Sequence, residues 1–182
     1  MGYALAEAAR DRGAEVKLVS SATLPEPDGI SLIQVETAEE MKRAVKEALL
    51  RADALIMAAA VSDYKPSRVQ REKIKKDSPA LNLKLEKTPD ILAEVQGGFL
   101  KIGFAAESQD LLKNARGKLE AKDLDMIVAN DITRPGSGFG SDTNKVTLLF
   151  KDGEVEELPV LPKREVADKI LDRVARLLPG KS

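Results

Sequence analysis

Apolar runs typical of strands and segments with helical spacing follow one another along the chain. Residues 54–60 form an unbroken apolar run, and residues 126–129, and 100–105 apart from Lys101, are similarly apolar. Runs of this length are typical of strands buried on both faces. Residues 15–20 and 30–35 add two further strand patterns, in the first of which Val16 and Leu18 share a face. The chain is therefore expected to contain a buried sheet of mainly parallel strands.

Segments with helical spacing separate these strands. A helix is expected to begin at Thr37, which forms a capping box with Glu40, and another to begin at Thr88 with Pro89 in its first turn. Ser108 is expected to cap a third. The expected helices cover residues 1–9, 37–50, 88–96, 108–121 and 163–178.

Two smaller patterns complete the expected fold. Leu81, Leu83 and Leu85 alternate with polar residues and indicate a half-exposed strand. Two strand patterns at residues 145–150 and 154–158 flank Asp152-Gly153, which favours a two-residue hairpin. Helices alternating with buried strands indicate an α/β fold, a doubly wound, Rossmann-like, mainly parallel sheet with a C-terminal antiparallel hairpin. The length of 182 residues suits a single domain.

Composition excludes several classes of function. The chain contains no Cys and no His, which rules out Cys nucleophiles, Ser-His-Asp triads, His bases, Cys/His zinc sites and disulfides. A net charge of −1 and 3% aromatic residues argue against nucleic-acid binding. No apolar run reaches the roughly 20 residues that span a bilayer. We therefore expect a cytoplasmic protein without membrane or nucleic-acid partners.

Three core strands end in polar segments. Asp63 follows the first apolar run, Glu107 follows the second, and Asn130-Asp131 ends the third. Because parallel strands place their carboxyl ends at one rim of a sheet, where ligands bind, we expect these segments to converge there.

Each candidate residue also has a purely structural interpretation. Asp63 suits a turn or a helix cap, and Asn130-Asp131 suits a turn after a strand. Phe104 is more often a core residue than a base-stacking platform. Lys118 and Lys122 lie four apart on one helix, which is typical of a solvated pair. The lysines at 73, 75 and 76 are by themselves more typical of a solvated surface.

The order of the motifs adds a family resemblance. The chain resembles the phosphopantothenoylcysteine synthetase (phosphopantothenate–cysteine ligase) domain of the bacterial bifunctional coenzyme A biosynthesis protein. The resemblance covers essentially all 182 residues. Six motifs carry it in this order: AAAVSDY, EKIKK, KTPDIL, GFAAES, KLEAKDLDMIVAND and GFGSDTNKVTLL.

The resemblance implies an enzymatic function with a nucleotide. Members of this family join 4′-phosphopantothenate to cysteine through an acyl-cytidylate, converting CTP to CMP and pyrophosphate with Mg²⁺. They dimerise and are commonly fused to a flavin-dependent decarboxylase half, which this chain does not resemble, so no flavin is expected here. Such chemistry needs positioning and charge stabilisation more than a protein nucleophile, and no protein metal ligands are expected.

The matching motifs also imply residue roles. Lys73 resembles the catalytic lysine of a flexible loop that contacts the triphosphate. The other expected nucleotide contacts are Ala58, Ala59, Asp63, Pro89, Asp90, Ile91, Leu92, Phe104, Lys118 and Lys122. Weaker candidates for the acyl substrate are Ala60, Asn130 and Asp131.

One departure from the family pattern is large. Family members begin with a strand, a glycine-rich turn and a segment close to Asn-Arg-Ser-Ser-Gly-Lys before the Met-Gly-Tyr found here at Met1. We therefore expect an N-terminally truncated domain that is weakly active or inactive by itself. The alternatives are a nicotinamide-dependent oxidoreductase, for which the chain lacks a G-x-G-x-x-G motif, and a non-catalytic fragment that binds nucleotide or dimerises.

Overall fold

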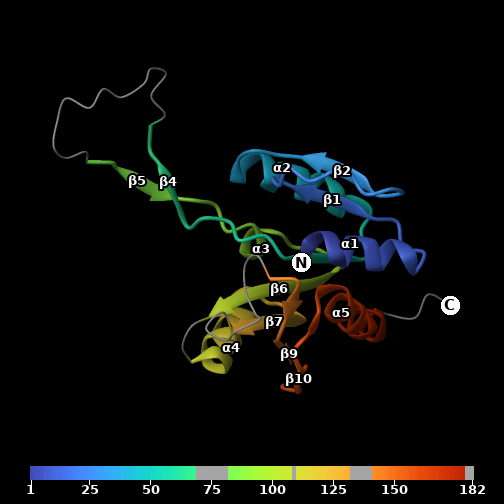
Figure 1. Ribbon diagram of the computed structural model, residues 1–182. Coiled ribbons are helices and arrows are strands. Elements are labelled where there is room, and N and C mark those ends of the chain that lie inside the picture. The colour runs from blue at the N-terminus through green and yellow to red at the C-terminus, as the bar shows by residue number, and fades with distance from the viewer. Residues whose placement is uncertain (69–81, 108–109, 132–140, 179–182) are drawn as a thin grey trace.

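The computed structural model describes residues 1–68, 82–107, 110–131 and 141–178. Its main sheet has five strands in the order β10-β9-β7-β6-β3 (Figure 1). The parallel strands β3 (Ala54–Met57), β6 (Leu100–Glu107) and β7 (Met126–Asp131) lie side by side, with β3 at one end of this order, and β9 (Val146–Phe150) and β10 (Val155–Glu157) add the antiparallel hairpin. The expected α/β fold is confirmed.

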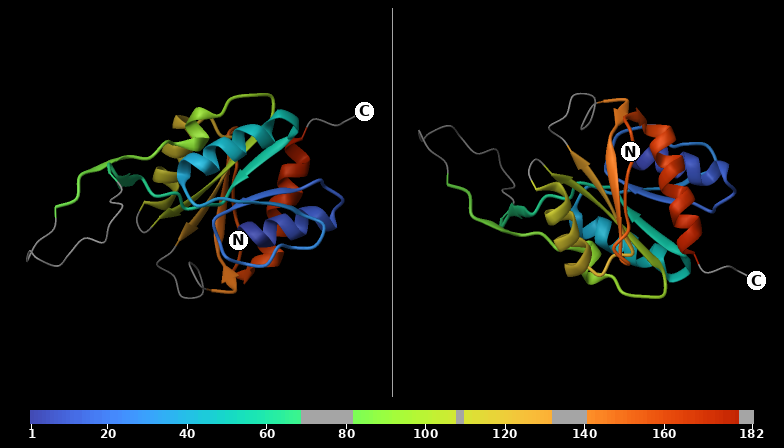
Figure 2. Two further views of the ribbon diagram at one scale, coloured as in Figure 1. Left: turned by 90° about the horizontal axis from the view of Figure 1, so that it is seen from above. Right: turned by 90° about the horizontal axis from the view of Figure 1, so that it is seen from below.

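Helices cover both faces of the main sheet (Figure 2). Helices α1 (Gly2–Asp11) and α5 (Lys163–Leu177) pack together on one face, over a core that includes Ile102 and Val128. Helix α4 (Leu111–Ala121) covers the other face, where Ala105 and Ala129 are buried. Neighbouring residues of β6 and β7 therefore point to opposite cores, as the period of a strand requires.

A second, two-stranded sheet lies beside the main one. Strands β1 (Lys17–Ser20) and β2 (Ser31–Gln34) are parallel to each other, and among the described residues neither pairs with β3. Helix α2 (Ala38–Ala48), which continues into the short η1 (Leu49–Arg51), shares a core cluster with residues of both sheets. That cluster contains Val19 of β1 and Leu55 and Met57 of β3. The two sheets thus share one covering layer without being joined by strand pairing.

An antiparallel arm projects from the body of the protein (Figure 1). It consists of β4 (Tyr64–Pro66) and β5 (Leu85–Lys87). The expected strand around residues 81–85 is wrong in extent, because residues 82–84 are not in a strand and residue 81 lies outside the described residues. A further small antiparallel pair joins β8 (Thr143–Asn144) to β11 (Leu161–Pro162).

Helix starts are confirmed in one case and corrected in another. Thr37 and Glu40 form the expected capping box of α2. The expected cap at Thr88 is wrong: α3 (Ile91–Glu94) begins after Asp90, whose side chain accepts a hydrogen bond from the Ala93 amide. Helix α4 follows Asp110, and Ser108 lies outside the described residues.

The C-terminal hairpin has a longer loop than expected. Phe150 and Glu154 close it, through a hydrogen bond of 3.0 Å from the Phe150 amide to the Glu154 carbonyl, so three residues form the loop instead of two. Gly153 adopts a φ of 98°, which favours glycine. The Asp-Gly signal located the hairpin correctly but gave the wrong loop length.

Gly103 allows α3 and the turn that follows α4 to pack closely on the sheet. A Cβ atom at Gly103 would lie 2.7 Å from Leu124 Cδ1 and 3.3 Å from Leu92 Cδ1. Gly103→Ala is therefore expected to lower the free energy of unfolding by about 1–3 kcal/mol, the usual cost of overpacking. Gly117→Ala is the control, since Gly117 has open space within α4 and alanine favours helix. Urea denaturation of both variants checks this, and equal stability of the two would contradict the packing.

An ion pair fastens the hairpin to α5. Arg173 donates to both carboxylate oxygens of Glu156, at 2.8 and 2.5 Å, and thereby lowers the pKa of Glu156 below its ordinary value of 4.5. A carboxyl group whose pKa is lowered in the folded state stabilises the fold at pH values above its ordinary pKa. This stabilisation is lost as the pH falls through the folded-state pKa. Glu156→Gln is thus expected to cost about 1 kcal/mol at neutral pH.

The cost of Glu156→Gln should shrink as the pH falls below 4.5. Urea denaturation across this range measures it, and the same substitution at the exposed Glu154 serves as control. A cost that stays constant with pH would show that the ion pair is not its cause.

None of the helices in the described ranges combines the length and the apolar character needed to cross a membrane.

Candidate functional site

Three polar segments meet at one rim of the main sheet. Strands β3, β6 and β7 are adjacent and parallel, so their carboxyl ends point the same way. At this rim Ala106 pairs in register with Asn130. The convergence expected from the sequence is therefore found in the fold, and it places residues 58–63, the end of β6 and Asn130 along one edge.

A backbone hydrogen bond links the segment after β3 to the segment that precedes α3. Ala58 packs against the core on the α1 and α5 face, whereas Ala59, Ala60 and Asp63 are exposed. The Asp63 carbonyl accepts a hydrogen bond of 2.9 Å from the Thr88 amide. This bond closes the base of the arm, so the two candidate segments around Asp63 and Pro89 lie side by side.

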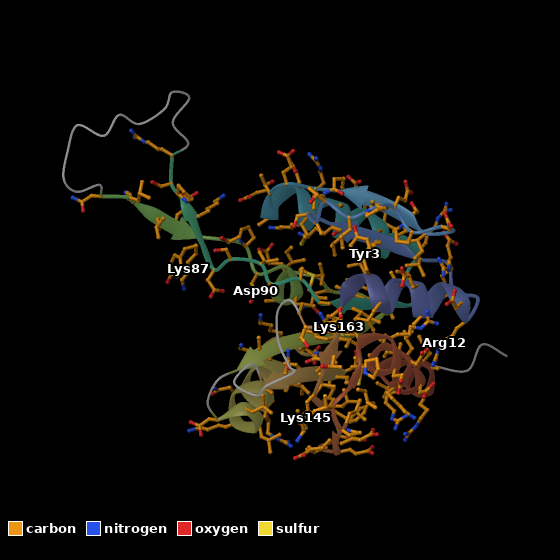
Figure 3. All side chains as sticks on the ribbon, viewed as in Figure 1. Tyr3, Arg12, Lys87, Asp90, Lys145 and Lys163 are labelled. Carbon is orange, nitrogen blue, oxygen red and sulfur yellow. The ribbon has the colours of Figure 1, made fainter. Side chains whose placement is uncertain are left out.

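Asp90 and Lys122 are brought together from different elements. Lys122 Nζ lies 2.9 Å from Asp90 Oδ2, while Asp90 Oδ1 accepts from the Ala93 amide at 3.3 Å. The carbonyl of Lys122 is in turn held by the ammonium of the buried Lys101, at 2.8 Å. Figure 3 shows Asp90 beside α3, between the body and the arm. This pair offers one cationic and one anionic group to a polar ligand.

The side chains of Ile91 and Leu92 are unavailable to a ligand. They are only 2% and 7% exposed and belong to two different core clusters. Any contact that these residues make with a nucleotide must therefore come from their backbone. Sequence reasoning could not distinguish backbone from side-chain contact at these positions.

The described candidates form two groups on opposite faces of the sheet. Phe104 packs toward α1 and α5 together with Ala58. Lys122 instead lies at the end of α4, which covers the other face, and Lys118 is exposed on the same helix. The carbonyl of Lys122 lies beside Lys101 near the start of β6, at the other end of the strands from the rim, and the Lys122 ammonium reaches Asp90.

Several candidates remain predictions. Lys73, Lys75 and Lys76 lie outside the described residues. For Asp131 the structure gives the backbone pairing with Glu107, and Asn130 is half-buried. Within the described ranges no three acidic side chains gather in a way that could hold a metal ion.

Two features of the structure were missed by sequence reasoning. The first is the arm, whose Lys65 pairs with Glu39 of α2; this contact raises the pKa of Lys65 and lowers that of Glu39. The second is a cavity of about 250 Å³ between α4 and β9, which contains none of the candidate residues. Neither the arm nor the cavity has a local sequence signature.

Comparison with known proteins identifies the family. Residues 1–178 match the family described as the DNA/pantothenate metabolism flavoprotein C-terminal domain. The chain belongs to this family. A curated relative, the coenzyme A biosynthesis bifunctional protein CoaBC of Bacillus subtilis, is 46% identical over 97% of this chain. The chain spans 45% of that relative's length. The family resemblance read from the motifs is therefore confirmed.

Solved structures agree with this assignment. The C-terminal domain of a CoaBC protein superposes with a TM-score of 0.81 at 41% identity, covering 97% of this chain and 81% of that one. Cab2, solved as an H337A mutant in complex with phosphopantothenate-cysteine, has a TM-score of 0.61 at 17% identity, over 82% of this chain and 54% of its own. At that identity the likeness concerns the fold alone.

Proposed function

We propose that this chain is the ligase domain of a phosphopantothenate–cysteine ligase acting in coenzyme A biosynthesis. The observation that carries the proposal is the 46% identity to a CoaBC protein across 97% of the chain. The convergence of three polar strand ends at one rim supports it, because that rim is where open α/β sheets bind nucleotides.

The proposed reaction has two steps. A carboxylate oxygen of 4′-phosphopantothenate attacks the α-phosphorus of CTP, the bond to the β-phosphate breaks, and pyrophosphate leaves. The amine nitrogen of cysteine then attacks the acyl carbon of the acyl-cytidylate, an amide forms, CMP leaves, and the amine proton passes to solvent. Both steps need aligned reactants and stabilised phosphate charge, which suits a chain without Cys or His.

The chain's own residues take distinct parts in this proposal. Lys73 neutralises charge on the triphosphate in the first step. Asp63 and the backbone of residues 58–60 form one wall of the nucleotide site, and Asp90 with Lys122 forms another. A bound Mg²⁺ would supply further charge neutralisation at the phosphates. Asn130 and Asp131, at the end of β7, are proposed to contact the acyl substrate.

The gap between β1 and β3 bears on whether the chain acts alone. Both strands leave an edge unpaired within the described residues, yet residues of both lie under α2. The hydroxyl of Tyr3, in the first turn of α1, is buried without a hydrogen-bond partner. We infer that a strand preceding Met1 in the family pattern fits between β1 and β3.

The partners included in the proposal are a second copy of the chain and a fused or associated decarboxylase half.

Ligand binding by the isolated chain tests the nucleotide part of the proposal. Calorimetric titration is expected to show binding of CTP with Mg²⁺ and no binding of NADPH. Lys122→Met should weaken CTP binding about tenfold, the scale of a charge-assisted contact, whereas Lys113→Met, on an exposed part of α4, should not. NADPH binding without CTP binding would favour the oxidoreductase alternative.

A further inference from the structure

Helix α2 contributes no residue to the proposed site, yet its charged side chains contact both elements that lead into it. Glu39, in the first turn of α2, is ion-paired with Lys65 of the arm. Lys42, one turn further along, is ion-paired with Glu94 of α3, and Lys46 lies 3.9 Å from the same carboxylate. Glu39, Lys42 and Lys46 are here called the α2 stripe.

The arm is weakly attached apart from this contact. Within the described part of the chain, Lys65 is the arm residue whose side chain is ion-paired to the body. The apolar side chains Tyr64 and Leu85 of the arm are 54% and 52% exposed, and neither belongs to a core cluster of the body. Its direction therefore depends on the Asp63–Thr88 backbone bond and on Lys65.

The direction of the arm affects both walls of the site. Strand β4 begins directly after Asp63, and β5 is followed directly by Thr88, Pro89 and Asp90. A rotation of the arm about its base would move these segments together. The contact of Lys42 with Glu94 acts on the other end of α3, so the stripe holds the Asp90 segment from two sides.

We propose that the α2 stripe positions the nucleotide site, with Glu39 fixing the arm through Lys65 and Lys42 fixing α3 through Glu94. Glu39, Lys42 and Lys65 are positioning residues in this account, because they act through Asp63 and Asp90. The functional part rests on the proposed function, whereas the positioning of the arm does not. Exposed ion pairs generally contribute little to global stability, so the effect should be on arm direction instead of folding.

Distance measurements test the positioning directly and require no activity. The chain has no cysteine, so Leu85→Cys on the arm and Leu50→Cys after α2, both exposed, accept one spin label each. Glu39→Gln and Lys65→Gln are each expected to broaden the distance distribution about twofold. Glu47→Gln, on an exposed part of α2, is the matched control and should leave it unchanged.

A charge exchange separates positioning from a local effect on α2. Glu39→Lys combined with Lys65→Glu should restore the narrow distribution, although a lysine in the first turn opposes the helix dipole. Addition of 1 M salt should broaden the distance distribution of the parent protein toward that of the variants, since exposed charges are then screened. An unchanged width in Glu39→Gln, or a charge exchange that fails to restore it, would overturn the proposal.

A turnover assay tests the link to function in a version of the protein that carries the N-terminal strand. Glu39→Gln and Lys42→Gln should each raise the KM for the nucleotide about two- to fivefold. The exchange of Glu39→Lys with Lys65→Glu should restore the KM of the parent protein. An altered distance distribution with an unchanged KM would retain the structural role of the stripe and refute its role in the site.

Discussion

Lys73→Gln is expected to lower the rate of acyl-cytidylate formation about 100-fold or more in a protein that carries the complete domain. This is the scale of loss when one preorganised group that stabilises developing charge is removed. The glutamine keeps much of the length and polarity of the side chain but removes the charge that the triphosphate requires. Rapid-quench measurement of the first half-reaction, with saturating CTP and 4′-phosphopantothenate, gives the rate directly.

The neighbouring lysines provide matched controls. Lys75→Gln and Lys76→Gln remove the same charge from the same segment, so a general electrostatic effect would lower all three rates alike. A much smaller loss is expected at positions 75 and 76. A near-normal rate for Lys73→Gln would remove this residue from the mechanism.

Adding the N-terminal strand and glycine-rich segment of the family pattern should produce the second large effect. The chain as it stands is expected to turn over weakly or not at all, and the extended chain at least about 100-fold faster, since misplaced catalytic groups cost that much. The physical reason is the gap between β1 and β3, where a parallel strand would pair with both edges. Product formation from 4′-phosphopantothenate, cysteine and CTP measures the difference.

Thermal unfolding separates a folding effect from a purely catalytic one. Filling the gap should raise the unfolding midpoint by about 10 °C, because several half-exposed residues of β1 and β3 become buried. An extension of the same length with the strand's apolar residues replaced by Ser should not do so. Robust ligation by the unextended chain would contradict the inferred need for this strand.

The sequence was sufficient to predict most of the central sheet. Apolar runs such as that around residues 54–57 are long enough to be buried on both faces, and their parallel order follows from the intervening helices. The capping box at Thr37 was predicted for a similar reason, since it depends on two residues three apart. Features determined by local pattern were thus accessible without the structure.

Features determined by tertiary packing could not be predicted from the sequence. The helix expected to be capped at Thr88 instead begins after Asp90, whose carboxylate accepts from the Ala93 amide, while the Thr88 amide pairs with the Asp63 carbonyl at the base of the arm. The burial of Ile91 and Leu92 follows from contacts with two different clusters. The ion pair between the arm and α2 joins residues 26 positions apart. No local spacing rule predicts such pairs.

The candidate site was predictable in place but not in detail. Parallel strand order required Asp63 and Asn130 to lie at the same rim. The pairing of Asp90 with Lys122, and the division of the candidates between the two faces of the sheet, required the structure. The role of Lys73 depends on family resemblance and awaits the rate measurement described above.

Pyrophosphate release in the absence of cysteine shows whether the domain forms an acyl-nucleotide. The extended chain, mixed with 4′-phosphopantothenate, CTP and Mg²⁺, should release about one pyrophosphate per active site and then stop, because the acyl-cytidylate awaits its amine. Addition of cysteine should then release CMP and phosphopantothenoylcysteine in equal amounts. If no pyrophosphate appears before cysteine is added, the chain does not act through an acyl-nucleotide and the account is contradicted.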